Sequence, residues 1–104
     1  MASVIVVYVI GPYRGANAWE VENNIRQAEI VSMRAATRGF VPLCPHTMFR
    51  YFNGTLTEQW WLDATLKLLE RCDAATCAPR WKESEGSRAE VDWCRTHNIP
   101  ILDL

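Results

Sequence analysis

The residues best suited to chemistry lie in one short stretch, Ser84-Glu85-Gly86-Ser87-Arg88-Ala89-Glu90. Its small residues stand where a loop is expected to turn into the last helix of the chain. Backbone N–H groups at a helix start are unpaired and carry partial positive charge, so this turn can hold an anion such as a phosphate. Glu90 would place a carboxylate beside that anion, which points to chemistry on a sugar phosphate.

The same stretch also has a purely structural interpretation. Ser87 and Glu90 have the S-x-x-E spacing of a capping box, in which the two side chains pair with N–H groups at a helix start. Taken alone, the stretch favours this interpretation, because capping boxes are common helix openings. Other parts of the chain are needed to distinguish a helix cap from a binding site.

Two further loops carry polar side chains that could join this stretch. The β-branched run over residues 4–10 is typical of a strand that is buried on both faces of a parallel sheet. It ends at the loop from Gly11 to Gly15, where Arg14 could bind a phosphate or carboxylate or simply lie in a surface turn. His46 follows a second short strand over residues 40–43; a lone histidine is more often structural than catalytic.

The order of the expected elements would bring these loops together. Helical periodicity covers residues 19–38, a segment opening at Trp60 and residues 87–97, and apolar strands are expected at 4–10, 40–43, 72–78 and 99–102. This pattern predicts one α/β domain over residues 1–104, a small Rossmann- or flavodoxin-like parallel sheet of about four strands in the order 2-1-3-4 with helices on both faces. The three loops would then meet at the carboxyl edge of the sheet, where such folds bind ligands.

The stretch over residues 47–59 is expected to be irregular and is rich in aromatic side chains. Such a loop could stack on a nucleobase or pack against a second subunit, and the sequence leaves both uses open. Asp63 follows in the first turn of the next helix. By itself, a carboxylate there is explained by favourable charge at a helix start.

Composition excludes several classes of function. The chain has 104 residues, 49% of them hydrophobic, and a net charge of −1, so we expect one globular domain that binds neither a nucleic acid polymer nor a membrane. Its four cysteines lack metal-ligand spacing, and we expect free thiols in the cytoplasm with no metal or cofactor. Five tryptophans in so small a domain favour a homodimer or a larger homo-oligomer.

Two spaced motifs resemble the nucleoside 2-deoxyribosyltransferase superfamily. They are Tyr8-x-x-Gly11-x-x-Arg14-Gly15 near the start and Ser84-x-Gly86-x-x-x-Glu90 near the end. Their spacing is most similar to the branch of 2′-deoxynucleoside 5′-monophosphate N-hydrolases. Residues 63–90 also resemble a compact, phage-associated group of uncharacterised members of that superfamily. Together the matches extend over nearly the whole chain.

The resemblance implies a role for each matching position. Glu90 would attack the anomeric carbon and form a covalent intermediate, with Tyr8 near the sugar and Asp63 as the proton donor for the leaving base. His46 would lie on the side of the base. The positions expected to contact the substrate or its 5′-phosphate are Gly11, Arg14, Gly15, His46, Ser84, Gly86 and Ser87.

We therefore expect cleavage of the N-glycosidic bond of a (deoxy)nucleoside 5′-monophosphate, with release of the free base. If a second base enters in place of water, the same intermediate gives a deoxyribosyltransferase. One alternative is a protein that binds or sequesters a nucleotide without turnover, and another is a structural or interaction module. Catalysis requires Glu90 itself, whereas binding should survive its removal.

Overall fold

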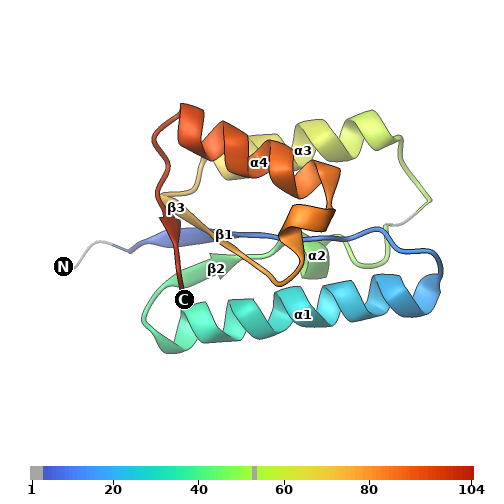
Figure 1. Ribbon diagram of the computed structural model, residues 1–104, viewed down its shortest axis with the longest axis horizontal. Coiled ribbons are helices and arrows are strands. Elements are labelled where there is room, and N and C mark those ends of the chain that lie inside the picture. The colour runs from blue at the N-terminus through green and yellow to red at the C-terminus, as the bar shows by residue number, and fades with distance from the viewer. Residues whose placement is uncertain (1–3, 53) are drawn as a thin grey trace.

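The computed structural model describes residues 4–52 and 54–104 and shows a three-layer α/β arrangement (Figure 1). Strands and helices alternate along the chain as the sequence predicts, except that an additional short helix, α2, precedes α3. In chain order the elements are β1 (Val6–Ile10), α1 (Ala18–Thr37), β2 (Val41–Leu43), α2 (Pro45–Met48), α3 (Glu58–Glu70), β3 (Ala74–Cys77), the 3-10 turn η1 (Trp81–Glu83), α4 (Glu85–Thr96) and β4 (Ile101–Leu102).

The four strands form one parallel sheet in the order β2-β1-β3-β4, which confirms the predicted topology. Tyr8 of β1 lies at the centre of the sheet, in register with Leu43 of β2 on one side and Ala75 of β3 on the other. The chain leaves β1 toward β2 and later returns to the opposite side of β1. This places a topological switch point between the carboxyl ends of β1 and β3, where open α/β sheets bind ligands.

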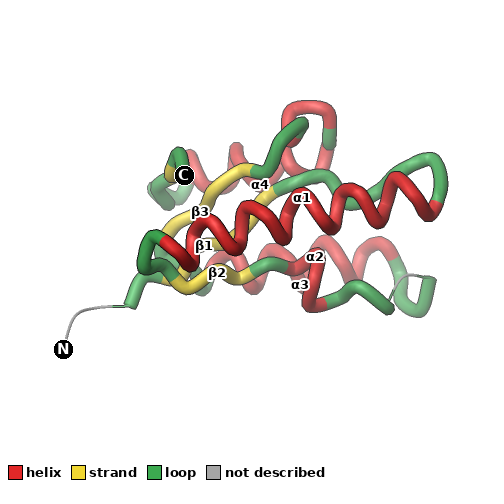
Figure 2. Tube along the Cα trace, turned by 90° about the horizontal axis from the view of Figure 1, so that it is seen from below, coloured by secondary structure: helices red, strands yellow, loops and turns green. Residues whose placement is uncertain are grey.

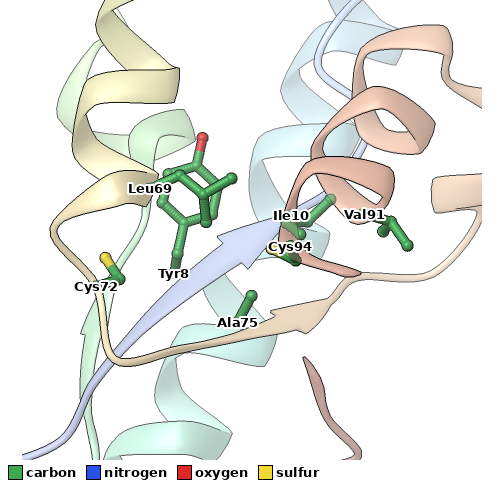
Figure 3. Packing of buried hydrophobic residues seen from close by; sticks show 7 residues of the cluster. All are labelled: Tyr8, Ile10, Leu69, Cys72, Ala75, Val91 and Cys94. Carbon is green, nitrogen blue, oxygen red and sulfur yellow. The ribbon is translucent and has the colours of Figure 1, made fainter. Parts of the chain in front are cut away.

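The side chains of β1 alternate between the two helical layers. Val9 packs with Ala28 and Val31 of α1, whereas Tyr8 and Ile10 point into the opposite layer. In that layer they meet Leu69 of α3 together with Val91 and Cys94 of α4 (Figure 3). In the view from below, α1 lies in front of the strands (Figure 2). The β-branched strand β1 is therefore buried on both faces, as its composition predicts.

Some element bounds differ from those expected from the sequence. The strands are shorter than the apolar runs that contain them; β4, for example, covers only Ile101–Leu102. The short helix α2 (Pro45–Met48) was not expected, and its end overlaps the start of the stretch over residues 47–59 that was expected to be irregular. Pro45 lies at its first position. Proline suits that position because its missing N–H would be unpaired there in any case. The segment between α2 and α3 remains irregular, as predicted, apart from residue 53, which lies outside the described residues.

None of the helices that the structure describes has the length and apolar character needed to cross a bilayer.

Candidate functional site

The centre of the candidate site is a hydrogen bond between Tyr8 and Glu90. Tyr8 lies in the middle of β1, and its ring points into the space between α3 and α4 (Figure 3). Its hydroxyl donates to Glu90 Oε2 across 2.5 Å. The two residues are 82 positions apart in the chain, so only the packing of α4 on the sheet brings them together.

Burial shifts the pKa of both members of this pair. It raises the pKa of Glu90 from its usual 4.5 to about 6, although the hydrogen bond from Tyr8 and the nearby His46 oppose the shift. Burial, and then the negative charge of Glu90, raise the pKa of Tyr8 well above its usual value of 10.0. At neutral pH the pair therefore consists of a neutral hydroxyl donor and a carboxylate that is mostly ionised. A partly desolvated carboxylate held by a donor is suited to act as a nucleophile or a base.

The start of α4 differs from the expected capping box. The residue that caps the helix is Ser84, whose Oγ accepts from the backbone N–H of Ser87 at 3.2 Å, and α4 begins at Glu85. Ser87 thus lies inside the first turn, and the carboxylate of Glu90 bonds to Tyr8. The capping-box interpretation of Ser87 and Glu90 is wrong, which leaves the Glu90 carboxylate without a capping role.

The first turn of α4 also holds a buried hydroxyl with unused hydrogen-bonding capacity. Ser87 is 2% exposed, and no partner is found for its Oγ among the described residues. Buried polar side-chain atoms nearly always have a partner, so an exception calls for an explanation such as a ligand. Beside it, Gly86 is exposed, and a side chain there would meet only Ser84 Oγ, at 4.0 Å. The turn is therefore open to an approaching group at Gly86.

The two glycines of the loop after β1 have a packing role. A Cβ at Gly11 would lie 2.8 Å from the Cβ of Ala78, and one at Gly15 would overlap Glu20. Both positions therefore require glycine because another part of the chain approaches closely. Between them, the Arg14 side chain is exposed and forms an ion pair with Glu58 at the start of α3.

Asn24 is a residue of this region that the sequence analysis missed. Its side chain is buried in α1, and its Nδ2 donates to the carbonyls of Tyr13 and Arg14 at 3.2 and 3.0 Å. Its Oδ1 accepts from Nη2 of Arg80 at 2.9 Å. The amide thus joins the loop after β1 to the loop after β3. The available signal was an asparagine on the apolar face of a predicted helix, next to Ile25.

Asp63 does not lie beside the Tyr8–Glu90 pair. Its side chain is exposed on α3 and accepts from Gln59 Nε2 at 2.9 Å. Thr65, two residues further along α3, faces Tyr8, and hydrogen bonding to its hydroxyl lowers the pKa of the Tyr8 phenol. Because a helix turns by about 100° per residue, Asp63 projects about 200° away from Thr65. The expected proton donor therefore points away from the candidate site.

His46 is buried, with both ring nitrogens facing groups of the protein. Its Nε2 lies 3.0 Å from the carbonyl oxygen of Gly11 and 3.1 Å from that of Pro12, and its Nδ1 lies 3.9 Å from Cys44 Sγ. These contacts tie α2 to the loop after β1. The ring affects Glu90 through its charge, since it lowers the pKa of that carboxyl. A direct hydrogen bond to a nucleobase would require one of these contacts to break.

Two surface grooves, of about 490 and 480 Å³, are seen in the structure, and neither is lined by Tyr8 or Glu90. Within residues 4–52 and 54–104, no three His, Cys, Asp or Glu side chains are grouped so that they could hold a metal ion. The candidate site therefore consists of the Tyr8–Glu90 pair and the first turn of α4, at the switch point of the sheet.

The chain was compared with known families and with curated proteins. No curated protein matches it. A family described as Domain of unknown function (DUF7768) matches residues 5–104, which include the Tyr8–Glu90 pair, the loop after β1 and the whole of α4. Because the match extends over almost the entire chain, this protein belongs to the family described as Domain of unknown function (DUF7768).

Proposed function

We propose that this protein cleaves the N-glycosidic bond of a (deoxy)nucleoside 5′-monophosphate, with Glu90 as the nucleophile. The observation that carries the proposal is the hydrogen bond from Tyr8 to Glu90 Oε2. This bond fixes the position of the Glu90 carboxylate. The motif resemblance to the nucleoside 2-deoxyribosyltransferase superfamily supports the same assignment. The proposed setting is the cytoplasm, where nucleotides are available and thiols stay reduced.

The carboxylate geometry is compatible with retaining chemistry at the anomeric carbon. Tyr8 holds Oε2 of Glu90, so Oε1 is the oxygen that attacks C1′ of the sugar. A C–O bond forms as the C–N bond breaks, and the base leaves with the electron pair of that bond and takes a proton from solvent. Water then attacks C1′ and gives one proton to solvent, while the bond between C1′ and Oε1 breaks and its electron pair returns to the Glu90 carboxylate, which releases the sugar phosphate. A free base in place of water would give transfer instead of hydrolysis.

The phosphate is proposed to bind at the first turn of α4. Unpaired N–H groups of that turn would face an incoming anion, Gly86 leaves the approach open, and Ser87 Oγ, which has no hydrogen-bond partner among the described residues, would donate to it. Arg14 would complete the site by exchanging its ion pair with Glu58 for the phosphate. Such an exchange costs little because both side chains of the pair are exposed.

A second candidate function is nucleotide binding without turnover. The observation that favours it is the position of Asp63, which is exposed on α3 and directed away from the Tyr8–Glu90 pair. In this case Glu90 would accept a hydrogen bond from a hydroxyl of the sugar. The phosphate would still bind at the turn around Gly86.

Chromatography of a nucleotide panel separates the two candidates. The protein is incubated with ribo- and deoxynucleoside 5′-monophosphates, and the free base released is measured for the wild type, Glu90→Gln and Glu85→Gln. Glu85 is the matched control, because it is an exposed glutamate in the first turn of the same helix. We expect release by the wild type and Glu85→Gln, and a loss of at least a hundredfold in Glu90→Gln.

Two results would contradict the glycosidase assignment. If Glu90→Gln releases base as fast as the wild type, Glu90 is not the nucleophile. If no nucleotide of the panel is cleaved but calorimetry detects binding, the protein binds nucleotides without turnover. A positive result can be strengthened by acid quenching during turnover, where a sugar phosphate adduct on the peptide containing Glu90 is expected by mass spectrometry.

A further inference from the structure

We propose that Cys44 and His46 form a second reactive site, a nucleophilic thiol that attacks small uncharged electrophiles reaching it from the groove beside β2. The Tyr8–Glu90 chemistry does not use this pair, and the inference does not depend on the glycosidase assignment. It rests on the hydrogen-bond partners of His46, the groups that surround the Cys44 sulfur and the groove that Cys44 lines.

The partners of His46 determine which ring nitrogen carries the proton. Its Nε2 faces the carbonyl oxygens of Gly11 and Pro12, at 3.0 and 3.1 Å. A carbonyl oxygen can only accept, so Nε2 must be the donor and must be protonated. In the neutral ring Nδ1 then has a free lone pair, and it faces Cys44 Sγ at 3.9 Å. The thiol proton therefore has a base next to it.

Other groups around the sulfur also stabilise its thiolate. Burial alone would raise the pKa of Cys44, but hydrogen bonding to His46, with further contributions from Ser32 and from the backbone N–H of Thr47, lowers it to about 7. The remaining three thiols behave differently. Burial raises the pKa of each of Cys72, Cys77 and Cys94 to about 11. Cys44 is thus distinguished from the other cysteines by its partners.

Cys44 is among the residues that line a surface groove of about 490 Å³, and this groove is the proposed route by which a small molecule reaches the thiol. The groove lies along β2, which is an edge strand, and most of its lining is apolar, with Val41, Leu43 and Met48 among its residues. Glu29 is the charged residue in this lining. A small uncharged molecule is therefore favoured over an anionic one, because the carboxylate of Glu29 repels an anion.

The reaction transfers the thiol proton before the bond to sulfur forms. His46 Nδ1 takes the proton of Cys44, and the thiolate then attacks the electrophilic carbon. With iodoacetamide as the probe, a C–S bond forms, the C–I bond breaks, and iodide leaves with the bonding electron pair. The imidazolium returns its proton to solvent. This is ordinary thiolate alkylation, in which the ionised fraction of the thiol controls the rate.

Three charged or titratable groups lie near this pair or in the groove beside it. They are Glu29 of α1 in the groove, Glu90 of α4, whose carboxyl responds to the charge of His46, and Tyr13, whose ring is tilted against His46 with the centroids 5.9 Å apart. The Glu90 carboxylate favours the imidazolium form of His46, which supports proton transfer from Cys44. Burial opposes that form, but hydrogen bonding to Cys44 and to the two carbonyls raises the pKa of His46 overall.

Limited alkylation of the full chain with iodoacetamide tests the proposal. The protein is treated at pH 7, and the modified cysteine is identified by peptide mass mapping. Cys77 is the internal comparison, because it is more exposed than Cys44, which is only 6% exposed. If accessibility controls the rate, Cys77 reacts first. We expect Cys44 to react first, at least tenfold faster than Cys77, with a rate that reaches half of its maximum near pH 7.

Two variants distinguish the effect of the His46 imidazole on the Cys44 rate from the effect of the surrounding packing. His46→Gln can still donate to the carbonyls of Gly11 and Pro12 but lacks the base at Nδ1, so its Cys44 rate at pH 7 should fall about tenfold. Ser32→Ala removes only a hydroxyl and should reduce the rate by a smaller factor in a protein that keeps its fold. Modification of Cys77 first, or a Cys44 rate and midpoint that neither variant changes, would overturn the proposal.

Discussion

The carboxyl group of Glu90 has a direct effect on stability that can be measured. Its pKa is about 6 in the fold and 4.5 when unperturbed, so between these pH values the native state binds more protons than the unfolded state. Stability therefore falls as the pH rises from about 4.5 to 6 and remains lower above that window. The cost is about 2 kcal/mol, since one unit of pKa corresponds to about 1.36 kcal/mol.

The first prediction is that Glu90→Gln stabilises the fold at pH 7.5 by about 2 kcal/mol and has little effect at pH 4. Glutamine keeps an acceptor for the Tyr8 hydroxyl but carries no charge to bury. Urea denaturation at both pH values measures the difference. The control is Glu85→Gln, at an exposed position, whose stability should follow that of the wild type at both pH values. A Glu90→Gln variant that is less stable than the wild type at pH 7.5 would contradict the buried-charge argument.

A substitution at Gly86 tests whether the glycine is needed for ligand binding or for folding. Its φ is not positive and a Cβ would make only an ordinary contact with Ser84 Oγ at 4.0 Å, so the backbone does not need glycine there. We predict that Gly86→Ala raises stability by about 0.5–1 kcal/mol, because alanine loses less conformational entropy in a helix. The same methyl group would obstruct an anion that approaches the first turn of α4, so nucleotide affinity should fall at least tenfold.

Thermal denaturation and calorimetric titration with a nucleoside 5′-monophosphate give the two readouts for Gly86→Ala. Ser87→Ala is the companion variant, since it removes the buried hydroxyl that lacks a partner without adding volume. Wild-type affinity in Gly86→Ala would show that the phosphate does not bind at this turn.

At the level of elements, Asn24 couples two loops that surround the switch point. We predict that Asn24→Ala destabilises the protein by about 1–3 kcal/mol, because the carbonyls of Tyr13 and Arg14 and the Arg80 guanidinium each lose a partner. Asn24→Ala should also lower nucleotide affinity more than a substitution elsewhere that destabilises the protein equally, because the loop that carries Arg14 loses its hydrogen bonds to Asn24. Asn23→Ala is the matched control, an exposed asparagine in the same helix. Equal effects of the two substitutions on denaturation would exclude the coupling.

Periodicity and composition predicted the elements and their order well, because the core depends on them directly. The continuous run around β1 could only be a strand buried on both faces, and the short α-β connections limited the topology to the order that is observed. Helix ends were harder to place. Ser84 and Ser87 both suit a helix start, and only the path of η1 decides that Ser84 is the cap.

Side-chain direction is the part of the site that the sequence could not provide. Asp63 was placed on the correct helix, but its rotation about the helix axis depends on which face of α3 packs on Tyr8, and that face carries Thr65 and Leu69. The Cys44–His46 contact was missed for a related reason. A C-x-H spacing carries no pairing signal, and the two side chains meet only because α2 turns between them.

At the scale of the whole molecule, the region around the first half of α3 presents aromatic and apolar side chains to solvent. Phe49, Phe52, Trp60 and Trp61 pack against one another with ring centroids 5.1–6.1 Å apart. Around this cluster, Tyr51 is 87% exposed and Leu62 is 48% exposed. An exposed group of large apolar residues is typical of an interface, and here it borders the Arg14–Glu58 ion pair near the candidate site.

The last prediction is that this surface joins two copies of the chain. A domain of 104 residues encloses little of a nucleotide, and the Tyr8–Glu90 pair lines neither groove, so a second copy over α3 would help to exclude water from the reaction. Leu62→Glu should convert a dimer into a monomer in sedimentation experiments, because it places a charge at an apolar contact. Lys67→Glu also adds a carboxylate to α3 but lies outside this aromatic surface, so it should leave the dimer intact. Base release should fall in Leu62→Glu and recover at higher protein concentration if that variant retains weak association. A wild-type protein that sediments as a monomer at every concentration would contradict the dimer and leave stacking on a nucleobase as the other use considered for the aromatic surface.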